Sequence, residues 1–255
     1  MDLQLADRVH ENLMTVNSWM GEGPGRGLHL DDGELLIASR SSFPFLNGAF
    51  RKRSRSEAEG LLTGARSFFF GRHRGFVAYA WPGDPLIEEA ALASGMFSVV
   101  DRYPEMVCRT PLRHLPGDIR PVEAPADAEA YWAVCDAAYP SLGFPPGLFS
   151  EAFEPTDLLD SQRVWACVAY DDDEPLACAS AWMADGVGMI GWVASSPAAR
   201  GRGLAAACTV RATNHLLDHG CEIASLQASS MGEEVYRHLG YEEIFSYRLF
   251  GAMPK

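Results

Sequence analysis

The stretch Met189–Ala207, MIGWVASSPAARGRGLAAA, carries the strongest structural signal in this sequence. Its first residues are apolar and predict a strand, and its last residues open an alanine-rich helix. Between them lies the loop Ser195–Arg200, and then Gly201 and Gly203 flank Arg202. Glycines at such a junction let backbone N–H groups turn toward an anion, and a helix N-terminus favours negative charge. The segment therefore predicts a cradle for a pyrophosphate group.

Other interpretations of this loop stay open. Arg200 and Arg202 offer charge and forked donors for phosphate, but a basic loop that simply begins a helix has the same composition. The pattern Gly201-x-Gly203-x-x-Ala206 also resembles the Rossmann fingerprint, with Glu222 about 20 residues further on. In a Rossmann fold, however, the glycine turn follows its strand directly, so a nicotinamide-dependent dehydrogenase is only a third hypothesis. No Gly-Lys-Ser/Thr follows, which excludes a Walker loop.

Helix and strand patterns alternate around the loop. Residues 163–196 read as three successive antiparallel strands, with turns at 171–175 and 184–186. The remaining elements of this region are a strand at 119–123, helices at 126–139 and 145–153, a strand at 222–229, a helix at 231–240 and a strand at 242–250. This order predicts an α+β fold on a mixed sheet.

The earlier part of the chain repeats this rhythm in a shorter form. We expect helices at 2–19, at 56–69 with a Ser56–Glu59 capping box, and at 84–97, and strands at 33–39, 45–50, 74–81 and 98–110. Pro104 is expected to interrupt the last of these strands. Residues 110–118 contain two prolines and a glycine and form the candidate linker. The prediction is therefore two halves, 1–117 and 118–255.

Charge is distributed unevenly between these halves. The chain has 21 Lys+Arg and 34 Asp+Glu, a formal net charge of -13. Residues 1–117 hold 13 basic and 14 acidic groups, whereas residues 118–255 hold 8 basic and 20 acidic groups, a net charge of -12. So acidic a protein is a poor non-specific binder of nucleic acid or of an anionic membrane surface. Neither class of partner is expected.

Composition also bears on location and on metals. No apolar run is long enough for a transmembrane helix, and the polar start MDLQLADRVHENLM does not resemble a signal peptide, so a cytoplasmic location is expected. The six cysteines form no C-x-x-C pair and lie mostly in apolar runs, which predicts buried free thiols and no metal site.

Two motifs resemble the GNAT acetyltransferases. Arg200-Gly201-Arg202-Gly203-Leu204-Ala205 matches the acetyl-CoA motif Arg/Gln-x-x-Gly-x-Gly/Ala of that family, and residues 226–250, LQASSMGEEVYRHLGYEEIFSYRLF, are similar to its closing strand–helix–strand pattern. The resemblance covers 118–255. The tail of 1–117 looks like a second, degenerate GNAT unit that lacks the cofactor loop, as in tandem members. The resemblance thus implies a GNAT acyl-CoA N-acyltransferase fold with two GNAT-like halves.

The resemblance also implies roles for individual residues. Backbone groups of Val193 and Ala194 would hold the pantetheine arm and polarise the thioester, and the N–H groups of 200–205 would hold the pyrophosphate. Ser229 lies where the family contacts CoA. Tyr236 matches the tyrosine that acts as general acid, although a half-buried core tyrosine on an amphipathic helix is the alternative.

The general base and the acceptor pocket are less defined. Some members carry a glutamate on the fourth strand, near Gly188 here, yet no carboxylate occurs from Val187 to Ser196. The base is then a water relay or one of Asp185, Glu151, Glu154 and His215. Aromatic and proline side chains are candidates for the wall of the acceptor pocket or for plain packing; they are Phe144, Pro145, Phe149 and Phe153.

These observations lead to one main functional hypothesis and one alternative. The main hypothesis is an enzyme, an N-acetyltransferase that uses acetyl-CoA and no metal to acetylate a primary amine of a small molecule or a protein. The alternative is a non-catalytic CoA-binding sensor. The acidic field around Arg200 and Arg202 would draw a cationic amine toward the acceptor side. A monomer is favoured over a homodimer, because tandem halves cover the surface through which single-domain members pair.

Overall fold

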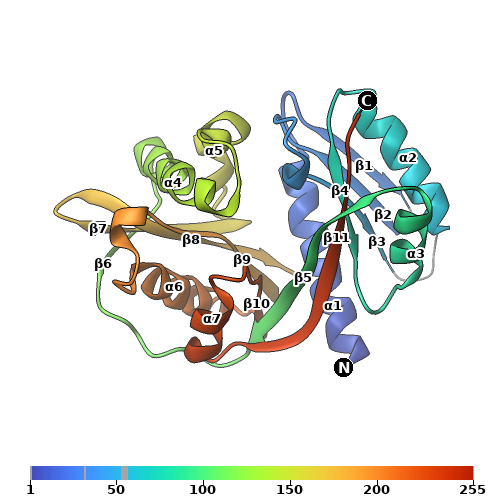
Figure 1. Cartoon of the computed structure of the whole chain (residues 1–255). Coiled ribbons are helices and arrows are strands. Elements are labelled where there is room, and N and C mark those ends of the chain that lie inside the picture. Colours follow the sequence, from blue (N-terminus) through green and yellow to red (C-terminus); the bar gives the residue numbers. More distant parts are fainter. Residues whose placement is uncertain (1, 32, 53–56, 255) are drawn as a thin grey trace. The chain divides into compact units, whose positions relative to one another are not determined.

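The computed structural model describes residues 2–31, 33–52 and 57–254. The chain divides into two compact units: one is Met1–Glu105 with Gln227–Ser230 and Glu243–Lys255, and the other is Met106–Leu226 with Met231–Glu242. These units differ from the halves 1–117 and 118–255, because the C-terminal segment lies in the first unit. The prediction of which half binds the cofactor is separate from this division into units. Figure 1 shows the elements of both units.

The first unit is a mixed sheet with helices. Its strand order is β1-β2-β3-β4-β11-β5. The pairs β1–β2, β2–β3 and β4–β11 are antiparallel, and β3–β4 is parallel. The elements are α1 (Leu3–Met20), β1 (Gly27–Asp31), β2 (Glu34–Ala38), η1 (Pro44–Leu46), β3 (Asn47–Arg51), α2 (Ala58–Phe70), β4 (Phe76–Ala80), α3 (Leu86–Ala93), β5 (Phe97–Cys108) and β11 (Glu242–Ala252).

Two sequence expectations in this unit need comment. Pro104 does not interrupt its strand, because β5 runs continuously from Phe97 to Cys108. At this position the strand uses the proline carbonyl, which accepts a hydrogen bond from the N–H of Ala228 at 2.8 Å, and the missing N–H of proline leaves that bond intact. The predicted Ser56 cap lies outside the described residues.

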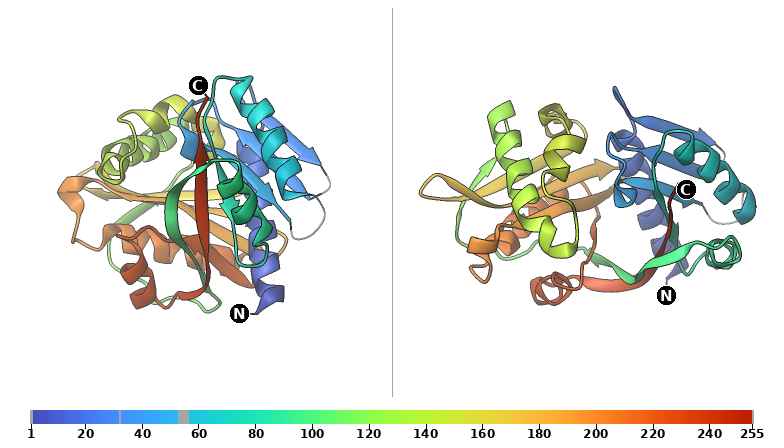
Figure 2. Two further views of the ribbon diagram at one scale, coloured as in Figure 1. Left: turned by 45° about the vertical axis from the view of Figure 1, so that its right-hand side comes forward. Right: turned by 45° about the horizontal axis from the view of Figure 1, so that its top comes forward.

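The second unit contains the sequence motif. Its strand order is β10-β9-β8-β7-β6, with β6–β7, β7–β8 and β8–β9 antiparallel and β9–β10 parallel. In Figures 1 and 2, α4 and α5 cover one face of this sheet and α6 and α7 the other. The elements are β6 (Asp118–Pro121), α4 (Pro125–Ala138), η2 (Tyr139–Leu142), α5 (Leu148–Ala152), η3 (Pro155–Leu158), β7 (Val164–Asp171), β8 (Glu174–Ala184), β9 (Val187–Ser195), η4 (Pro197–Ala199), α6 (Leu204–Asp218), β10 (Ile223–Gln227) and α7 (Glu233–Leu239).

The observed topology confirms the predicted α+β class with a mixed sheet. Three antiparallel strands lead into the glycine loop, and the short helix η4 separates β9 from α6. A Rossmann turn needs a βαβ unit with the glycines directly after the strand, so this loop is of another kind. Within the described residues, none of the helices has the length and apolar character needed to cross a bilayer.

Candidate active site

Strand β9 is paired along its length on one side only. Its pairing with β8 runs from Val187–Ala184 to Ser195–Ala177. Its parallel pairing with β10 covers only the first three residues and ends at Met189–Ser225. Beyond that point, within the described chain, the β10 side of β9 has unpaired backbone groups. Val193 and Ala194, the residues predicted to hold a pantetheine arm, lie in this part.

A bulge distorts the same part of β9. Cys178 of β8 faces Ala194, but Ser180 faces Gly191, so Trp192 and Val193 together oppose a single residue. Trp192 has a φ of 47°, in the left-handed region. For a bulky side chain this conformation costs about 1–3 kcal/mol and persists only where the surroundings enforce it.

Side-chain hydroxyls hold the bulge in place. The hydroxyl of Ser180 donates to the carbonyl of Gly191 at 2.8 Å, and the hydroxyl of Tyr131 donates to the carbonyl of Trp192 at 3.0 Å. Tyr139 donates to the carbonyl of Val193 at 3.3 Å. Burial raises the pKa of Tyr131 well above its usual value, so its hydroxyl stays protonated and can donate. These bonds satisfy three successive carbonyls and fix the backbone of the bulge.

The glycine loop after β9 ends in an uncapped helix. Gly201 and Gly203 have φ angles of 76° and 77°, and a Cβ atom at either would meet no protein atom within 4 Å. Gly203 is the N-cap of α6 and has no side chain to accept from the first-turn N–H groups, and that turn contains no acidic residue. Because four N–H groups at a helix start lack an intrahelical partner, this end of α6 favours an anion.

The two arginines of the loop are engaged with protein groups. Arg200 Nη2 donates to Ser141 Oγ at 2.6 Å and to the carbonyl of Ala138 at 3.3 Å. Arg202 Nη2 pairs with Asp171 Oδ2 at 2.6 Å. Arg200 thus ties the loop to the end of α4, and Arg202 ties it to the end of β7. The backbone N–H groups are the donors that the loop itself presents, apart from that of Arg202, which donates to the carbonyl of Ala199 at 3.3 Å.

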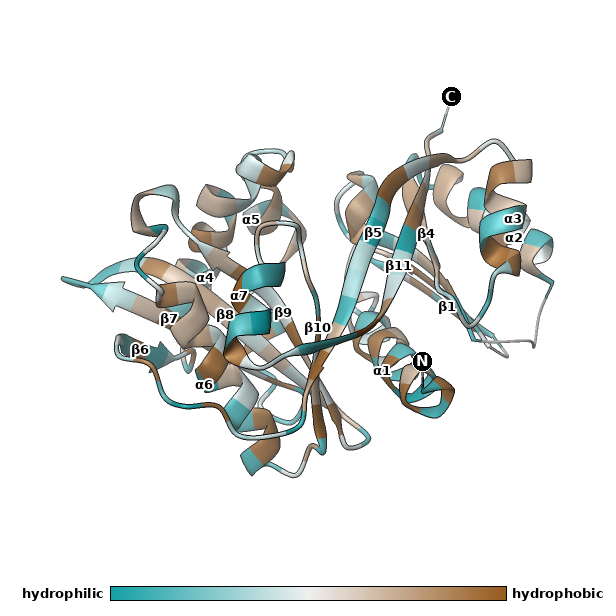
Figure 3. Ribbon diagram, turned by 60° about the horizontal axis from the view of Figure 1, so that its bottom comes forward, coloured by the Kyte–Doolittle hydropathy of each residue, from teal (hydrophilic) through white to brown (hydrophobic). Residues whose placement is uncertain are grey.

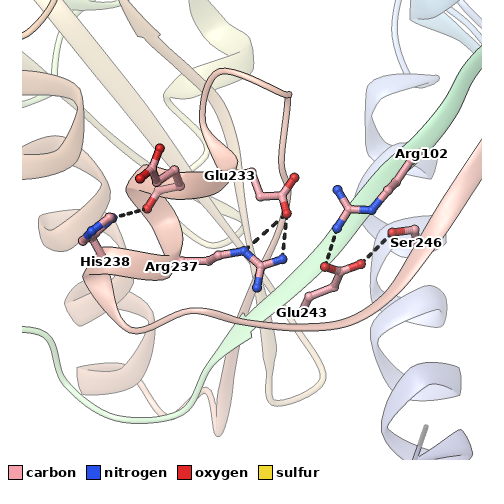
Figure 4. Close-up of polar contacts among 7 residues, drawn as sticks. Arg102, Glu233, Arg237, His238, Glu243 and Ser246 are labelled. Carbon is pink, nitrogen blue, oxygen red and sulfur yellow. Dashed lines mark hydrogen bonds and ion pairs between the residues drawn. The ribbon is translucent and has the colours of Figure 1, made fainter.

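Tyr236 lies in α7, on the α6 face of the sheet. The short helix forms because Glu233 and Glu234 stand in its first turn and Arg237 and His238 in its last, which suits the helix dipole. Arg237 pairs with Glu233 at 2.6 Å, as Figure 4 shows, and the helix is largely hydrophilic in Figure 3.

The side chain of Tyr236 faces inward from this polar helix. It is buried, and its ring lies 6.0 Å from that of Tyr241. Burial raises its pKa, so the phenol is neutral at physiological pH and holds a proton that it can donate. Ser229 follows β10, in the segment Gln227–Ser230 that belongs to the first unit.

The candidate bases are now placed. Asp185 is an exposed residue of the β8–β9 turn with a φ of 50°, at the opposite end of β9 from Val193. Glu151 and Glu154 are exposed. His215 lies in the last turn of α6 and stacks on Trp165 at 4.6 Å, about 16 Å along the helix from the loop.

Packing explains why no carboxylate stands near Gly188. A Cβ atom there would lie 2.5 Å from two methyl carbons of Leu216, so a side chain at this position would require Leu216 to move. Burial and His219 lower the pKa of His215 to about 4. This imidazole is therefore neutral at physiological pH, but it lies at the wrong end of α6 to serve the bulge.

The aromatic residues of 139–155 form packed interior. Asp136 anchors α5 by accepting from the N–H of Phe149 at 2.7 Å. Phe149 and Phe153 are buried, and both lie in stacked orientation against Trp132. Phe144 is half-buried and Pro145 exposed. Sequence reasoning missed Trp192, Tyr131 and Ser180, because no local pattern reveals a bulge or the side chains that hold it.

The cysteine prediction is confirmed. All six cysteines are buried and none is in a disulfide. Among the residues that the structure describes, no group of three or more His, Cys, Asp or Glu side chains is arranged to hold a metal ion.

Comparison with known proteins agrees with this geometry. The model of the Acetyltransferase (GNAT) family matches residues 129–241. A comparison with curated protein sequences found no significant match.

Solved structures resemble nearly the whole chain. A GCN5-related N-acetyltransferase from Kribbella flavida has 21% identity and a TM-score of 0.74, over 98% of this chain and 96% of that one. A tandem GNAT protein from the clavulanic acid biosynthesis pathway has 13% identity and a TM-score of 0.62, over 97% and 95%. A GCN5-related N-acetyltransferase from Sphaerobacter thermophilus has 16% identity and a TM-score of 0.60, over 97% and 93%.

At such identities the structural likeness shows the fold, and the family match adds the sequence evidence. The match spans α4 through α7, and so includes β9, the glycine loop and Tyr236. Residues 129–241 therefore match the acetyltransferase (GNAT) family, and nearly the whole chain shares the fold of solved GNAT structures.

Proposed function

We propose that the protein is an acetyl-CoA-dependent N-acetyltransferase that acetylates a primary amine of a small-molecule or protein acceptor by direct attack in a ternary complex. The observation that carries this proposal is the continuous segment Val193–Ala205. It joins an unpaired strand edge, a fixed bulge and an uncapped helix start. Acetyl-CoA carries a thioester, a long arm and a pyrophosphate, and its binding needs these three features in this order.

Different residues have different roles in the acyl transfer. The N–H groups of Arg200–Ala205 bind the pyrophosphate, and the backbone of Val193 and Ala194 binds the pantetheine arm and polarises the thioester carbonyl. Because the bulge is fixed by side-chain hydroxyls, these backbone groups need no reorganisation as negative charge develops on the oxygen. Tyr236 gives its proton to the departing thiolate.

We propose that the amine loses its proton to water and not to a carboxylate of β9. No acidic residue occurs from Val187 to Ser196, and the side chain of Leu216 packs against Gly188, where a carboxylate would stand. The pH dependence of turnover should then follow the pKa of the amine that is supplied.

We also propose a tandem organisation with one cofactor site, in the second unit, and a monomeric protein. Two features of the first unit support the single site. The N-cap of α2 is Glu57, and Glu59 stands in the first turn of that helix, so its N-terminus already carries negative charge. Sedimentation at micromolar concentration tests the monomer.

A glycine pair provides a sharp test of the cofactor site. Gly203→Ala places a methyl group in the open space at the start of α6, whereas Gly220→Ala does the same just beyond the other end of that helix. Both positions have positive φ, 77° and 91°, and open space, so the backbone strain is matched. In calorimetric titrations, Gly203→Ala should weaken acetyl-CoA binding at least tenfold relative to Gly220→Ala. Equal affinities would remove the loop from the site.

Thiol release separates the enzyme from the non-catalytic sensor. The missing carboxylate on β9 is the observation that favours a sensor. With acetyl-CoA and a panel of primary amines, an enzyme releases CoA thiol in an amine-dependent way. A sensor binds acetyl-CoA in the calorimeter and releases none above the rate without protein.

A further inference from the structure

Trp192 stands directly before the backbone groups assigned to the thioester. It occupies the bulge of β9, with its carbonyl held by the hydroxyl of Tyr131 at 3.0 Å. Neighbouring Cα atoms are about 3.8 Å apart, so the indole is attached one residue away from Val193. Its φ of 47° is a conformation that tryptophan rarely adopts. A tryptophan kept in such a conformation calls for a reason beyond the backbone, since glycine would suit it better.

The indole lies on the α4–α5 face of the sheet. Its ring meets those of Phe149 and Phe153 edge-on, at centroid distances of 5.1 and 5.6 Å, and that of Tyr139 at 6.0 Å. Phe149 and Phe153 are buried and fixed against Trp132. Trp192 itself stays partly exposed. It is therefore the outer ring of a packed aromatic cluster, and part of this residue remains accessible.

The two faces of this sheet have different surroundings. Helix α6, with its uncapped end, covers the face opposite Trp192, and the glycine loop joins the two faces because Arg200 donates to the end of α4. A nucleophile has to approach the thioester carbon from a side that the cofactor does not fill. On the α4–α5 face, the groups next to Val193 are the indole and the hydroxyl of Tyr139, which donates to the carbonyl of Val193 at 3.3 Å.

We infer that Trp192 determines acceptor specificity and that the acceptor is an amine joined by a short linker to an aromatic ring, which packs against the indole. The inference rests on the proposed acetyltransferase function. An aromatic ring beside the stack gains offset or edge-to-face contact and loses water from both surfaces. A short aliphatic amine gains neither.

The test compares two probes within each variant, 2-phenylethylamine and 1-propylamine, with acetyl-CoA and thiol release as the assay. The measured quantity is the ratio of kcat/KM for the two amines, so that changes in the shared machinery cancel. We expect a ratio of at least ten for the wild type and for Trp165→Phe, a control at the other end of α6 beside His215. In Trp192→Gly, whose backbone suits the bulge, the ratio should fall below three. Trp192→Phe should keep most of it.

Two results would overturn the inference. One is a wild-type ratio near one, and the other is an unchanged ratio in Trp192→Gly that retains wild-type circular dichroism.

A binding measurement separates this failure from failure of the proposed function. In the presence of CoA, the indole N–H signal of Trp192, assigned by its loss in Trp192→Phe, should shift on addition of 2-phenylethylamine and not of 1-propylamine. If the protein releases no thiol with any amine, the enzyme proposal fails while the shift still tests the aromatic site. No shift with either amine refutes the aromatic site on its own.

Discussion

Each unit contains a parallel strand pair connected by a helix, but the pairs end differently. In the first unit, β3 and β4 pair at Gly48–Val77 and Ala49–Ala78. Arg51, at the end of β3, then binds Asp84, beyond β4, through two hydrogen bonds of 2.5 and 2.7 Å. Both side chains are buried. In the second unit, β9 and β10 part after Met189–Ser225, and β9 goes on alone into the bulge.

The helices that follow differ in charge. The first turn of α2 begins beside Glu57 and includes Glu59, whereas α6 begins at Gly203 and has no acidic residue in its first turn. Negative side chains stabilise a helix start and at the same time repel an anionic ligand. One strand–helix arrangement is therefore closed and structural in the first unit, and open toward an anion in the second. A few residues at the strand ends and the helix start make the difference.

The largest effect is expected from breaking the buried Arg51–Asp84 pair, which closes the strand arrangement of the first unit. Asp84→Asn leaves the buried Arg51 guanidinium without its counter-charge, so the free energy of unfolding should fall by about 3–5 kcal/mol. Urea denaturation measures it. The control is Asp118→Asn, which breaks an exposed pair with Arg120 and should have little effect on stability because solvent screens such pairs. Similar values for the two variants would show that the buried pair does not hold the first unit together.

The next largest effect is expected from acid, which should lower the stability of the first unit. His10 is buried, accepts from the Tyr247 hydroxyl at 2.9 Å and donates to the carbonyl of Arg51 at 2.9 Å. Burial lowers its pKa to about 4, against 6.5 in the unfolded chain. The unfolded state therefore takes up the proton first. The stability contributed by neutral His10 is complete above pH 6.5 and is lost as the pH falls toward 4, by about 2 kcal/mol between pH 7 and 5.

A histidine variant isolates this contribution. The His10→Gln variant should lose less stability than the wild type between pH 7 and 5, as measured by urea unfolding at both values. Asp84, Glu11 and Lys52 also act on His10, and His215 in the second unit has a lowered pKa as well, so the comparison is made with His215→Gln alongside. An identical loss in His10→Gln and the wild type would contradict the assignment.

Removal of the proposed proton donor, Tyr236, tests the comparison from the side of the second unit. Tyr236→Phe should lower turnover more than tenfold without changing acetyl-CoA affinity, since general-acid groups contribute about 10²–10⁴. The matched variant is Tyr241→Phe, which removes a buried hydroxyl bonded to Thr213 at 2.6 Å and should affect stability and not turnover. Wild-type turnover in Tyr236→Phe would leave the tyrosine as a core residue only.

The smallest effect concerns the anion site itself. Asp171 occupies Arg202 and adds negative charge beside the loop. Asp171→Asn should tighten acetyl-CoA binding about two- to threefold, in keeping with the modest strength of exposed ion pairs. Asp173→Asn, in the same turn but paired with Arg120, is the control. Weaker binding in Asp171→Asn would mean that the pair positions the loop and does not compete with the ligand.

Much of the second unit could be predicted from sequence because glycines mark the ends of its helices. Gly203 and Gly220 bracket α6, and Gly240 ends α7 with a φ of 104°. In the first unit, the glycine-rich run 21–27 hid the strand β1 that begins at Gly27. Glycines show where a helix or strand is interrupted, but they do not show on which side of the interruption a short edge strand begins.

Other features depend on contacts that sequence does not display. Trp192 reads as an ordinary strand residue, and only the register with β8 shows the bulge. Phe149 and Phe153 have the composition of a pocket wall, yet packing against Trp132 buries them. The unit that receives β11 is likewise invisible locally, because strand pairing between distant segments depends on tertiary structure.

The position of β11 has a consequence for synthesis of the protein. This strand lies between β4 and β5 in the sheet of the first unit, yet the ribosome makes it after all the other strands of both units. Nascent domains usually fold in order from the N-terminus. Here residues 1–105 have to wait, with the edges of β4 and β5 unpaired, until β11 leaves the exit tunnel. The unit that is translated first is thus completed last. A protein chain that stops before residue 242 contains β4 and β5 without the strand that lies between them.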